Sequence, residues 1–472
     1  MNLDIGRSGE MKYRLFCAYI LIAILSNCRP TLKKSVLDPS LFSGFLISNT
    51  IDFATPAIPQ GISIKSDASG VNTMLVVTKD DTQFNSKGFF VVGREGGGFT
   101  STRYFHRNCF TDSANLNFSN PNSRVSLCSS KGTDFDSGRA SILYTFAFNF
   151  LLSEASNGPQ NQTFSAVSSS LSSNPFIPFS ISATESPTLG IAARDTEIGS
   201  FVRNGNVIGF LSRDSSQNQS TVLKYYESTN EGSSFTTIPL LGSMNNANCL
   251  DLTVIDNTIA CGIQFFRSGA SWQTITIQGF TLGFNTNIYN LGKINNTYYF
   301  GTLNRNNLAN PFTFFNSTGG SYASGSVSYT QFSTGFSGSN NLSSFGNNLS
   351  FRFYSRFQSL PNGNLVVLGG VFLGGGSGGP GVIAPLIFVG RSNFAVVSIA
   401  LPLGSGQTVS EILGGGYFNG KYYLLVSVFQ NANNANSGRQ SLSNVLFETS
   451  DLTNFSNFTV SRLSFVNNSM GL

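Results

Sequence analysis

Six cysteines are the residues of this sequence best suited to redox or metal chemistry. Four of them fall in two near pairs, Cys109 with Cys128 and Cys249 with Cys261. Neither pair has the gap of roughly two to four residues found in structural zinc sites, and the single histidine, His106, leaves almost no imidazole to complete one. We therefore expect no bound metal or cofactor, and either two disulfides that close short loops or four free thiols.

The remaining residues with catalytic chemistry form no recognisable constellation. His106 stands alone beside Cys109, so acid–base catalysis by histidine has a single candidate. Asp134 and Asp136 indicate a turn or a calcium-type loop, but the distal glutamate of such a loop is missing. The sequence nominates no pair of carboxylates for glycoside hydrolysis, although such a pair could come from distant segments. We expect no catalytic residue.

An apolar leader precedes Cys28. From Met11 the chain reads M-K-Y-R, then an apolar run from Leu15 to Leu25, then L-S-N-C-R-P. A basic start, a short apolar run and a small-residue cleavage site are typical of a secretory signal, and the run is too short to anchor stably across a bilayer. The sequence therefore predicts export.

Cys28 stands where signal peptidase would otherwise find its small residue. The tetrapeptide Leu25-Ser26-Asn27-Cys28 resembles a bacterial lipobox in the relaxed form of spirochaetal lipoproteins, although Asn27 replaces the Gly or Ala of the stricter form. The resemblance implies that Cys28 is diacylated and then acylated again, which gives the two or more lipid signals needed for stable anchoring. The alternative is an ordinary cleaved signal with an incidental cysteine.

These features divide the chain into three parts. We expect a lipoprotein-type signal peptide over residues 1–27 with its start at Met11, a lipidated tether over residues 28–40, and one β-domain over residues 41–472. The location implied is the cell envelope, on the outer membrane, with the membrane face left open.

The composition of the β-domain favours short strands joined by many turns. The chain has 44 Phe and 49 Gly, and it is rich in Ser, Thr and Asn. A recurring phrase places an Asn-Gly or Asn-Asn turn before a strand-like run. Asn and Gly tolerate positive φ, so each copy predicts a hairpin. The copies begin at Asn204-Gly205, Asp256-Asn257, Asn295-Asn296, Asn362-Gly363 and Asn419-Gly420.

The phrase recurs at a spacing typical of stacked multi-strand units. A four-stranded propeller blade of about 40–50 residues fits this spacing better than a helical solenoid. We therefore predict an all-β chain that forms a β-propeller of about seven four-stranded blades, with six or eight as alternatives. The predicted units are residues 60–105, 120–170, 197–240, 249–282, 287–332, 350–401 and 409–465.

One segment supports the same architecture. Residues 228–235, S-T-N-E-G-S-S-F, resemble the Asp-box of sialidase-type propellers, with pattern Ser-x-Asp-x-Gly-x-Thr-Trp. Asn230 replaces the Asp, and Phe235 replaces the Trp. The resemblance implies a structural hairpin in which Ser228 and Asn230 cap the turn, Gly232 takes positive φ and the aromatic ring packs beneath. Ser48-Asn49 and Ser450-Asp451 look like more degenerate copies.

The functional expectation is a lipid-anchored, non-enzymatic module that binds or scaffolds host or envelope proteins or glycans. One alternative is a sialidase-like glycoside hydrolase. The first arginine of sialidases lies in a Phe/Tyr-Arg-Ile/Leu-Pro motif, and Phe351-Arg352-Phe353-Tyr354 lacks its aliphatic residue and proline, so we expect Arg352 to point outward from its strand. A structural protein of the cell envelope is the other alternative.

Charge excludes one class of partner. The formal net charge is +5 over 472 residues, and no run of Lys and Arg interleaved with aromatics appears. Nucleic-acid binding needs a dense cationic stripe against phosphate, so we expect no nucleic-acid partner. The expected membrane contact is through the N-terminal lipid.

Overall fold

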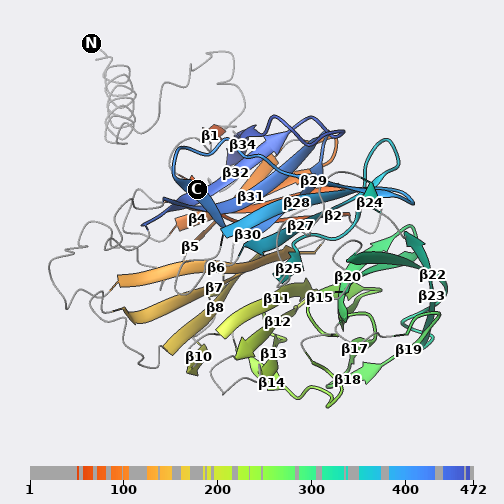
Figure 1. The fold of residues 1–472 in the computed structure, drawn as a ribbon. Coiled ribbons are helices and arrows are strands. Elements are labelled where there is room, and N and C mark those ends of the chain that lie inside the picture. Colours follow the sequence, from red (N-terminus) through yellow and green to blue (C-terminus); the bar gives the residue numbers. More distant parts are fainter. Residues whose placement is uncertain are drawn as a thin grey trace, which may run out of the picture. The chain divides into compact units, whose positions relative to one another are not determined.

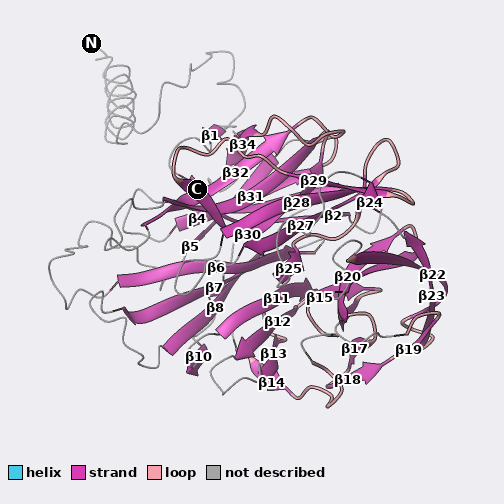
Figure 2. Ribbon diagram, viewed as in Figure 1, coloured by secondary structure: helices cyan, strands magenta, loops and turns pink. Residues whose placement is uncertain are grey.

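Strands and loops make up the whole of the part of the chain that the computed structural model describes, and Figure 2 shows no helix there. The prediction of an all-β chain is confirmed for these residues. In the same residues no helix has the length and apolar character needed to cross a membrane. The described residues are 50–52, 57–66, 72–80, 87–97, 99–105, 125–136, 139–150, 161–170, 184–185, 189–192, 196–214, 222–232, 234–245, 248–281, 286–304, 311–333, 336–337, 350–373, 382–430, 440–461 and 464–467.

The signal peptide predicted over residues 1–27 and the tether over residues 28–40 lie outside the described residues, and so do His106 and Cys109.

The described strands form seven sheets, named here A to G in chain order. In spatial order, sheet A contains β1 (Thr50–Asp52), β34 (Ser464–Asn467), β5 (Phe99–Phe105), β4 (Lys87–Arg94), β3 (Asn72–Asp80) and β2 (Ala57–Ser66). Sheet B contains β10 (Leu189–Ala192), β8 (Asn161–Ser170), β7 (Arg139–Phe150) and β6 (Val125–Phe135), with β9 (Thr184–Glu185) on β8. Sheet C contains β11 (Thr196–Asn204), β12 (Val207–Asp214), β13 (Val222–Ser228) and β14 (Thr236–Ile238).

The second half of the chain repeats this arrangement. Sheet D contains β15 (Leu252–Ile255), β16 (Thr258–Cys261), β17 (Phe265–Ser268) and β18 (Ser271–Thr274). Sheet E contains β19 (Thr276–Gln278), β23 (Ser326–Ser333), β22 (Phe312–Ser321), β21 (Thr297–Asn304) and β20 (Thr286–Ile294). Sheet F contains β24 (Phe336–Ser337), β29 (Phe394–Ser398), β28 (Val382–Gly390), β27 (Leu365–Leu373) and β25 (Ser350–Phe353), with β26 (Gln358–Ser359) on β27. Sheet G contains β30 (Gln407–Phe418), β31 (Lys421–Gln430), β32 (Gln440–Thr449) and β33 (Thr459–Val460).

Consecutive strands pair antiparallel within each sheet, and three sheets also contain one parallel strand, which lies at the edge of sheets E and F and next to the edge strand β1 in sheet A. Short strands β19, β24 and β34 pair in parallel with β23, β29 and β5, respectively. In the chain, β19, β24 and β34 follow the strands of sheets D, E and G, but they pair in sheets E, F and A, respectively. Because β34 lies between β1 and β5, both ends of the described chain meet in sheet A.

The opposite edge of each sheet contacts its neighbours. We call the strands at this edge the first strands: β2, β6, β11, β15, β20, β25 with β26, and β30. Contacts run from β2 to β6, on to β11, β15 and β20, and β30 contacts both β27 and β2 (Figure 1). Sheets E and F share a core cluster. The first strands therefore bring residues far apart in the sequence close together.

The hairpin turns predicted from Asn and Gly are confirmed. Asn295 and Asn296 have φ of 46° and 64° between β20 and β21, and Asn419 and Gly420 have φ of 48° and 81° between β30 and β31. Both central residues of a type I′ turn need positive φ, which few side chains tolerate. The seven segments predicted from this spacing fall in seven different sheets, in the same order.

Aromatic side chains fill the space between sheets E and F. Phe314 is fully buried, and its ring centroid lies 5.2 Å from that of Phe357 and 4.7 Å from that of Phe394. Such pairs contribute about 0.5–1.5 kcal/mol each beyond their burial. The abundance of Phe in the composition is thus explained by sheet-to-sheet packing.

Bulges in the first strands allow close packing. The register of β6 against β7 shifts between Ser130 and Gly132. A Cβ atom at Gly132 would lie 2.4 Å from the Cβ of Phe201 in sheet C, which is too close for any side chain. Glycine at the bulge therefore lets neighbouring sheets approach.

Candidate functional site

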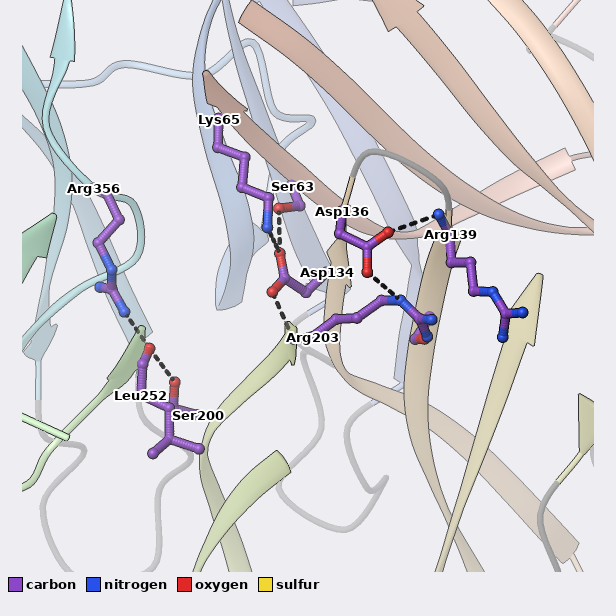
Figure 3. A network of polar contacts seen from close by, with 10 residues as sticks. Ser63, Lys65, Asp134, Asp136, Arg139, Ser200, Arg203, Leu252 and Arg356 are labelled. Carbon is purple, nitrogen blue, oxygen red and sulfur yellow. Dashed lines mark hydrogen bonds and ion pairs between the residues drawn. The ribbon is translucent and has the colours of Figure 1, made fainter. Parts of the chain in front are cut away.

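Asp134 joins three sheets. It lies at the carboxyl end of β6, where its Oδ1 accepts a hydrogen bond from Lys65 Nζ of β2 at 2.7 Å. Its Oδ2 accepts one from the backbone N–H of Arg203, on β11, at 2.8 Å. Figure 3 shows Lys65 and Asp134 pointing toward each other, while the side chain of Arg203 extends toward Asp136. The expectation that Asp134 belongs to a turn is wrong, because the residue lies within a strand.

Arg203 is the centre of the same group. Its side chain is fully buried and donates to Asp136 Oδ2 at 3.0 Å and to Ser141 Oγ at 2.7 Å. A third donor, Nη2, lies 2.8 Å from Glu231 Oε2, and the guanidinium of Arg139 also contacts Glu231. A buried guanidinium needs such partners, because an unpaired buried charge is strongly unfavourable.

We call these residues the Asp134 cluster. Three cations face three carboxylates, so the formal charges balance. Its members are Lys65, Asp134, Asp136, Arg139, Arg203 and Glu231. With its charges matched and its central arginine buried, the Asp134 cluster is built to hold sheets A, B and C together.

A second charged group spans sheets D and F, and we call it the Asp251 cluster. Asp251 directly precedes β15, and its side chain is 4% exposed. Arg352 Nη2 lies 3.9 Å from its Oδ1, and Arg356 Nη1 lies 3.7 Å from its Oδ2. Both arginine side chains are about one third exposed, at 30% and 29%. Two cations therefore face one carboxylate, at ion-pair distances longer than a hydrogen bond.

Backbone contacts hold Arg356 in place. Its Nη2 donates to the carbonyl oxygen of Leu252 at 2.6 Å, and that oxygen also accepts a hydrogen bond from Ser200 Oγ at 3.3 Å (Figure 3). Arg352 lies over the ring of Tyr354, with its guanidinium carbon 5.7 Å from the centroid. The expectation that Arg352 points outward is wrong, because it reaches toward Asp251 of another sheet.

A tyrosine–glutamate pair lies between sheets C and D. Tyr225 donates its hydroxyl to Glu227 Oε2 at 2.9 Å, and Arg267 binds both oxygens of Glu227 at 2.8 and 2.9 Å. Burial and the charge of Glu227 raise the pKa of Tyr225 well above its ordinary value. Both side chains are buried, and the ring of Tyr225 packs edge-on against Trp272 of sheet D at 5.0 Å. The pair therefore contributes to the packing of the two sheets.

The structure joins Cys249 to Cys261 in a disulfide, with the two Cα atoms 5.0 Å apart. This bridge closes a short loop around the start of sheet D, two residues before Asp251. The pair predicted between Cys109 and Cys128 lies outside the described residues, because the description leaves out Cys109 and the side chain of Cys128.

The segment over residues 228–235 forms a capped turn between β13 and β14. Ser228 Oγ accepts a hydrogen bond from the N–H of Gly232 at 2.8 Å, and Asn230 Oδ1 accepts one from the N–H of Ser234 at 2.9 Å. Gly232 has a φ of 85°. The ring of Phe235 packs edge-on against Phe210, at 5.4 Å.

A second turn, between β32 and β33 of sheet G, has the same position and the same pattern. Asp451 Oδ1 accepts hydrogen bonds from the N–H groups of Thr453 at 3.1 Å and Asn454 at 2.9 Å. Its Oδ2 accepts one from Ser456 Oγ at 2.6 Å. These bonds lower the pKa of Asp451 to about 2. Both turns are structural. The other degenerate copy, at Ser48-Asn49, lies outside the described residues.

In the part of the chain that the structure describes, no group of three His, Cys, Asp or Glu side chains is arranged to hold a metal ion. Sequence reasoning did not single out Lys65, Arg203, Asp251 or Arg356. Their rarity could have indicated them, because charged residues make up only 11% of the chain and these four lie in or next to first strands.

No protein-family model matches the sequence. A search of curated protein sequences also found no match. Among solved structures, the chain resembles a Trypanosoma rangeli sialidase in complex with sialic acid, at 9% identity and a TM-score of 0.38, over 86% of this chain and 59% of that one. It also resembles a Bombyx mori GH32 β-fructofuranosidase at 13% identity and a TM-score of 0.32, over 71% and 62% of the two chains.

A third similar structure is a Fusarium graminearum α-L-arabinofuranosidase, at 10% identity and a TM-score of 0.29, over 70% of this chain and 80% of that one. This chain spans less than two thirds of the sialidase and of the fructofuranosidase.

Proposed function

We propose that residues 41–472 form a seven-bladed β-propeller that binds an acidic glycan at the Asp251 cluster, and that Cys28 anchors it to the outer membrane through lipid. Three observations support a closed ring: the contacts from β2 through β6, β11 and β15 to β20, the core cluster shared by sheets E and F, and the contacts of β30 with β27 and β2. In such a ring, the first strands surround the axis, and ligands bind where their side chains converge.

The observation that carries the ligand class is that two partly exposed arginines converge at the Asp251 cluster. Arg352 and Arg356 both direct guanidinium groups toward one buried carboxylate, while about a third of each side chain is open to solvent. A guanidinium binds a planar carboxylate through paired hydrogen bonds. The cluster thus suits a ligand that carries a carboxylate, such as a sugar acid.

Glycoside hydrolysis by a sialidase-like enzyme is the second candidate. One observation favours it: Oδ2 of Asp251 is buried and accepts no hydrogen bond, so the arginines lie beside a carboxyl oxygen that could take part in catalysis. Hydrolysis needs a second carboxyl group about 5–10 Å away. Asp134, on a first strand of another sheet, and Asp136, which follows that strand, are already held by Lys65 and Arg203. The geometry therefore supports binding better than turnover.

The test is a calorimetric titration of the full-length chain with N-acetylneuraminate and D-glucuronate, and with neutral N-acetylglucosamine as the comparison. We expect the acids alone to bind. The double variant R352M/R356M should lower the affinity at least about tenfold, since a hydrogen bond to a charged group is worth about 1.5–3 kcal/mol. Arg391→Met is the matched control, because this arginine donates to Gly363 O on an exposed turn of the same sheet.

Two results would contradict the proposal. Equal affinity for the neutral sugar would show that the arginines do not select the ligand. Release of fluorophore from the 4-methylumbelliferyl glycoside of either acid, lost in D251N, would establish the hydrolase instead. No binding of any sugar would favour the envelope-protein alternative.

Lipid anchoring is tested separately. Mass spectrometry of the mature N-terminus should find Cys28 acylated, and Cys28→Ser should move the protein out of the membrane fraction. An uncut and unacylated N-terminus would contradict the proposal.

A further inference from the structure

The disulfide between Cys249 and Cys261 encloses the segment that carries Asp251. Leu252 pairs with Cys261 in the ladder between β15 and β16. The N–H of Gly262 donates to the carbonyl oxygen of Asp251 at 3.1 Å. Asp251 is therefore fixed from the side of Cys249 by the bridge and from the side of Gly262 by a backbone hydrogen bond.

Asn290 extends this brace to Arg356. Its side chain is buried and donates to the carbonyl oxygen of Gly262 at 2.6 Å, while its Oδ1 accepts the N–H of Gly292 at 2.9 Å. Gly292 lies against Arg356, since a Cβ at this glycine would be 3.3 Å from the Cβ of the arginine. The N–H of Phe357, the next residue, donates to Leu291 O at 2.9 Å.

The path from the bridge thus reaches both sides of the Asp251 cluster. We infer that the Cys249–Cys261 disulfide, acting through Gly262 and Asn290, positions Asp251 against Arg352 and Arg356, so that its oxidation state regulates anion binding there. The inference rests on the proposed function for its ligand. The brace itself can be tested without one.

The redox step is a two-electron reduction by a dithiol. The sulfur–sulfur bond breaks, each sulfur gains one electron and one proton, and the dithiol becomes a disulfide. Both cysteines are fully buried, so the dithiol reaches them only after the segment around Asp251 opens. A ligand that holds this segment closed must then slow reduction, because the coupling between two binding equilibria is reciprocal.

The first experiment needs no ligand. The full-length oxidised chain and the variant C249A/C261A are treated with p-hydroxyphenylglyoxal, and the modification of each arginine is followed by mass spectrometry. We expect Arg352 and Arg356 to react several-fold faster in the variant, with Arg391 unchanged. If Arg352 and Arg356 react at the same rates in the variant as in the oxidised parent, the inference is overturned.

A second variant keeps the experiment decisive if C249A/C261A does not fold. Asn290→Asp leaves the disulfide intact and removes the donor to Gly262 O. It should raise the modification of Arg352 and Arg356 in the same direction, by a smaller factor. No change in this variant also overturns the inference.

The second experiment measures reduction by dithiothreitol with and without D-glucuronate at ten times its dissociation constant. If opening limits access, the rate should fall about elevenfold. In a protein that binds D-glucuronate, an unchanged rate overturns the inference and leaves the proposed function standing. Absence of binding to the oxidised chain overturns the proposed function, and arginine modification then decides on the brace.

Discussion

The Asp134 cluster and the Asp251 cluster both place charged side chains at the first strands, but in different environments. They meet on β11, where Ser200 belongs to the contacts around Leu252 and Arg203 belongs to the Asp134 cluster. In the Asp134 cluster, Arg203 is fully buried and every charge has an opposite charge within hydrogen-bond distance. In the Asp251 cluster, the ion pairs are 3.7 and 3.9 Å long and the arginines are partly exposed.

This difference indicates which of the two clusters can contact a ligand from solvent. Desolvating a charge is expensive, so a buried guanidinium such as that of Arg203 persists only when opposite charges surround it. In the Asp134 cluster, three cations and three carboxylates meet that condition. In the Asp251 cluster, two arginines that are partly open to solvent face one buried carboxylate. We therefore assign stability to the first and recognition to the second.

Arg203→Met is expected to have the largest effect, and it tests whether the Asp134 cluster stabilises the fold. The change removes a fully buried cation and leaves Asp136 and Glu231, which are 24% and 16% exposed, without their central partner. Removing one partner of a buried ion pair costs about 3–5 kcal/mol. We expect a loss of that size in the free energy of unfolding from urea titration, with unchanged affinity for D-glucuronate in the protein that stays folded.

Arg139→Met is the matched control, because Arg139 also contacts Glu231 but its side chain is 42% exposed. Exposed ion pairs contribute about 0–1 kcal/mol, so this variant should be close to the parent in stability. Equal losses in the two variants would show that the burial of Arg203 does not set the difference.

A pair of isosteric changes gives the next effect in size. Asp134→Asn removes the charge that binds Lys65 and the N–H of Arg203, and it should lower stability by about 1.5–3 kcal/mol. Asp251→Asn should change stability by less than about 1 kcal/mol, because the arginines it faces are partly exposed and their distances are long. Thermal and urea unfolding of both variants measure this contrast. A larger loss in D251N than in D134N would reverse our assignment of the two clusters.

Local sequence patterns predicted much of the fold. The Asn-Gly and Asn-Asn turns mark hairpins because positive φ is a local requirement, and it can be recognised from two adjacent residues. Asn295-Asn296 and Asn419-Gly420 are examples in which the structure has this geometry. The capped turn at Ser228 follows from the same logic. The parallel strands β19, β24 and β34 were not predicted, because their pairing joins segments that no local pattern links.

The candidate site could not be predicted for the same reason. Asp251 and Arg352 are about a hundred residues apart, and only the contacts between first strands bring them together. Asp134 was interpreted as a turn residue because acids favour turns, whereas here Lys65 and the backbone of Arg203 stabilise it inside a strand. Tertiary pairing overrode local preference at both positions.

The smallest expected effect is on the stability of the fold at acidic pH. It comes from Asp451, which lies outside both clusters. Hydrogen bonds from Asn454 and Ser456 lower the pKa of Asp451 to about 2. A carboxyl group whose pKa is lower in the folded state stabilises the fold above its unfolded pKa of about 3.9, and this contribution is lost as the pH falls toward 2. Asp451→Asn should therefore flatten the dependence of the urea midpoint on pH between about 4 and 2.

The equivalent turn in sheet C supplies the control for this prediction. Asn230 accepts the same kind of backbone hydrogen bond with an uncharged amide, so the geometry does not require a carboxylate. Asn230→Asp should add the acid dependence that Asp451→Asn removes. Parallel curves for the parent and both variants would mean that acid acts elsewhere, and the carboxylates of the Asp134 cluster, which pair with Lys65 and Arg203, would then be the next groups to replace.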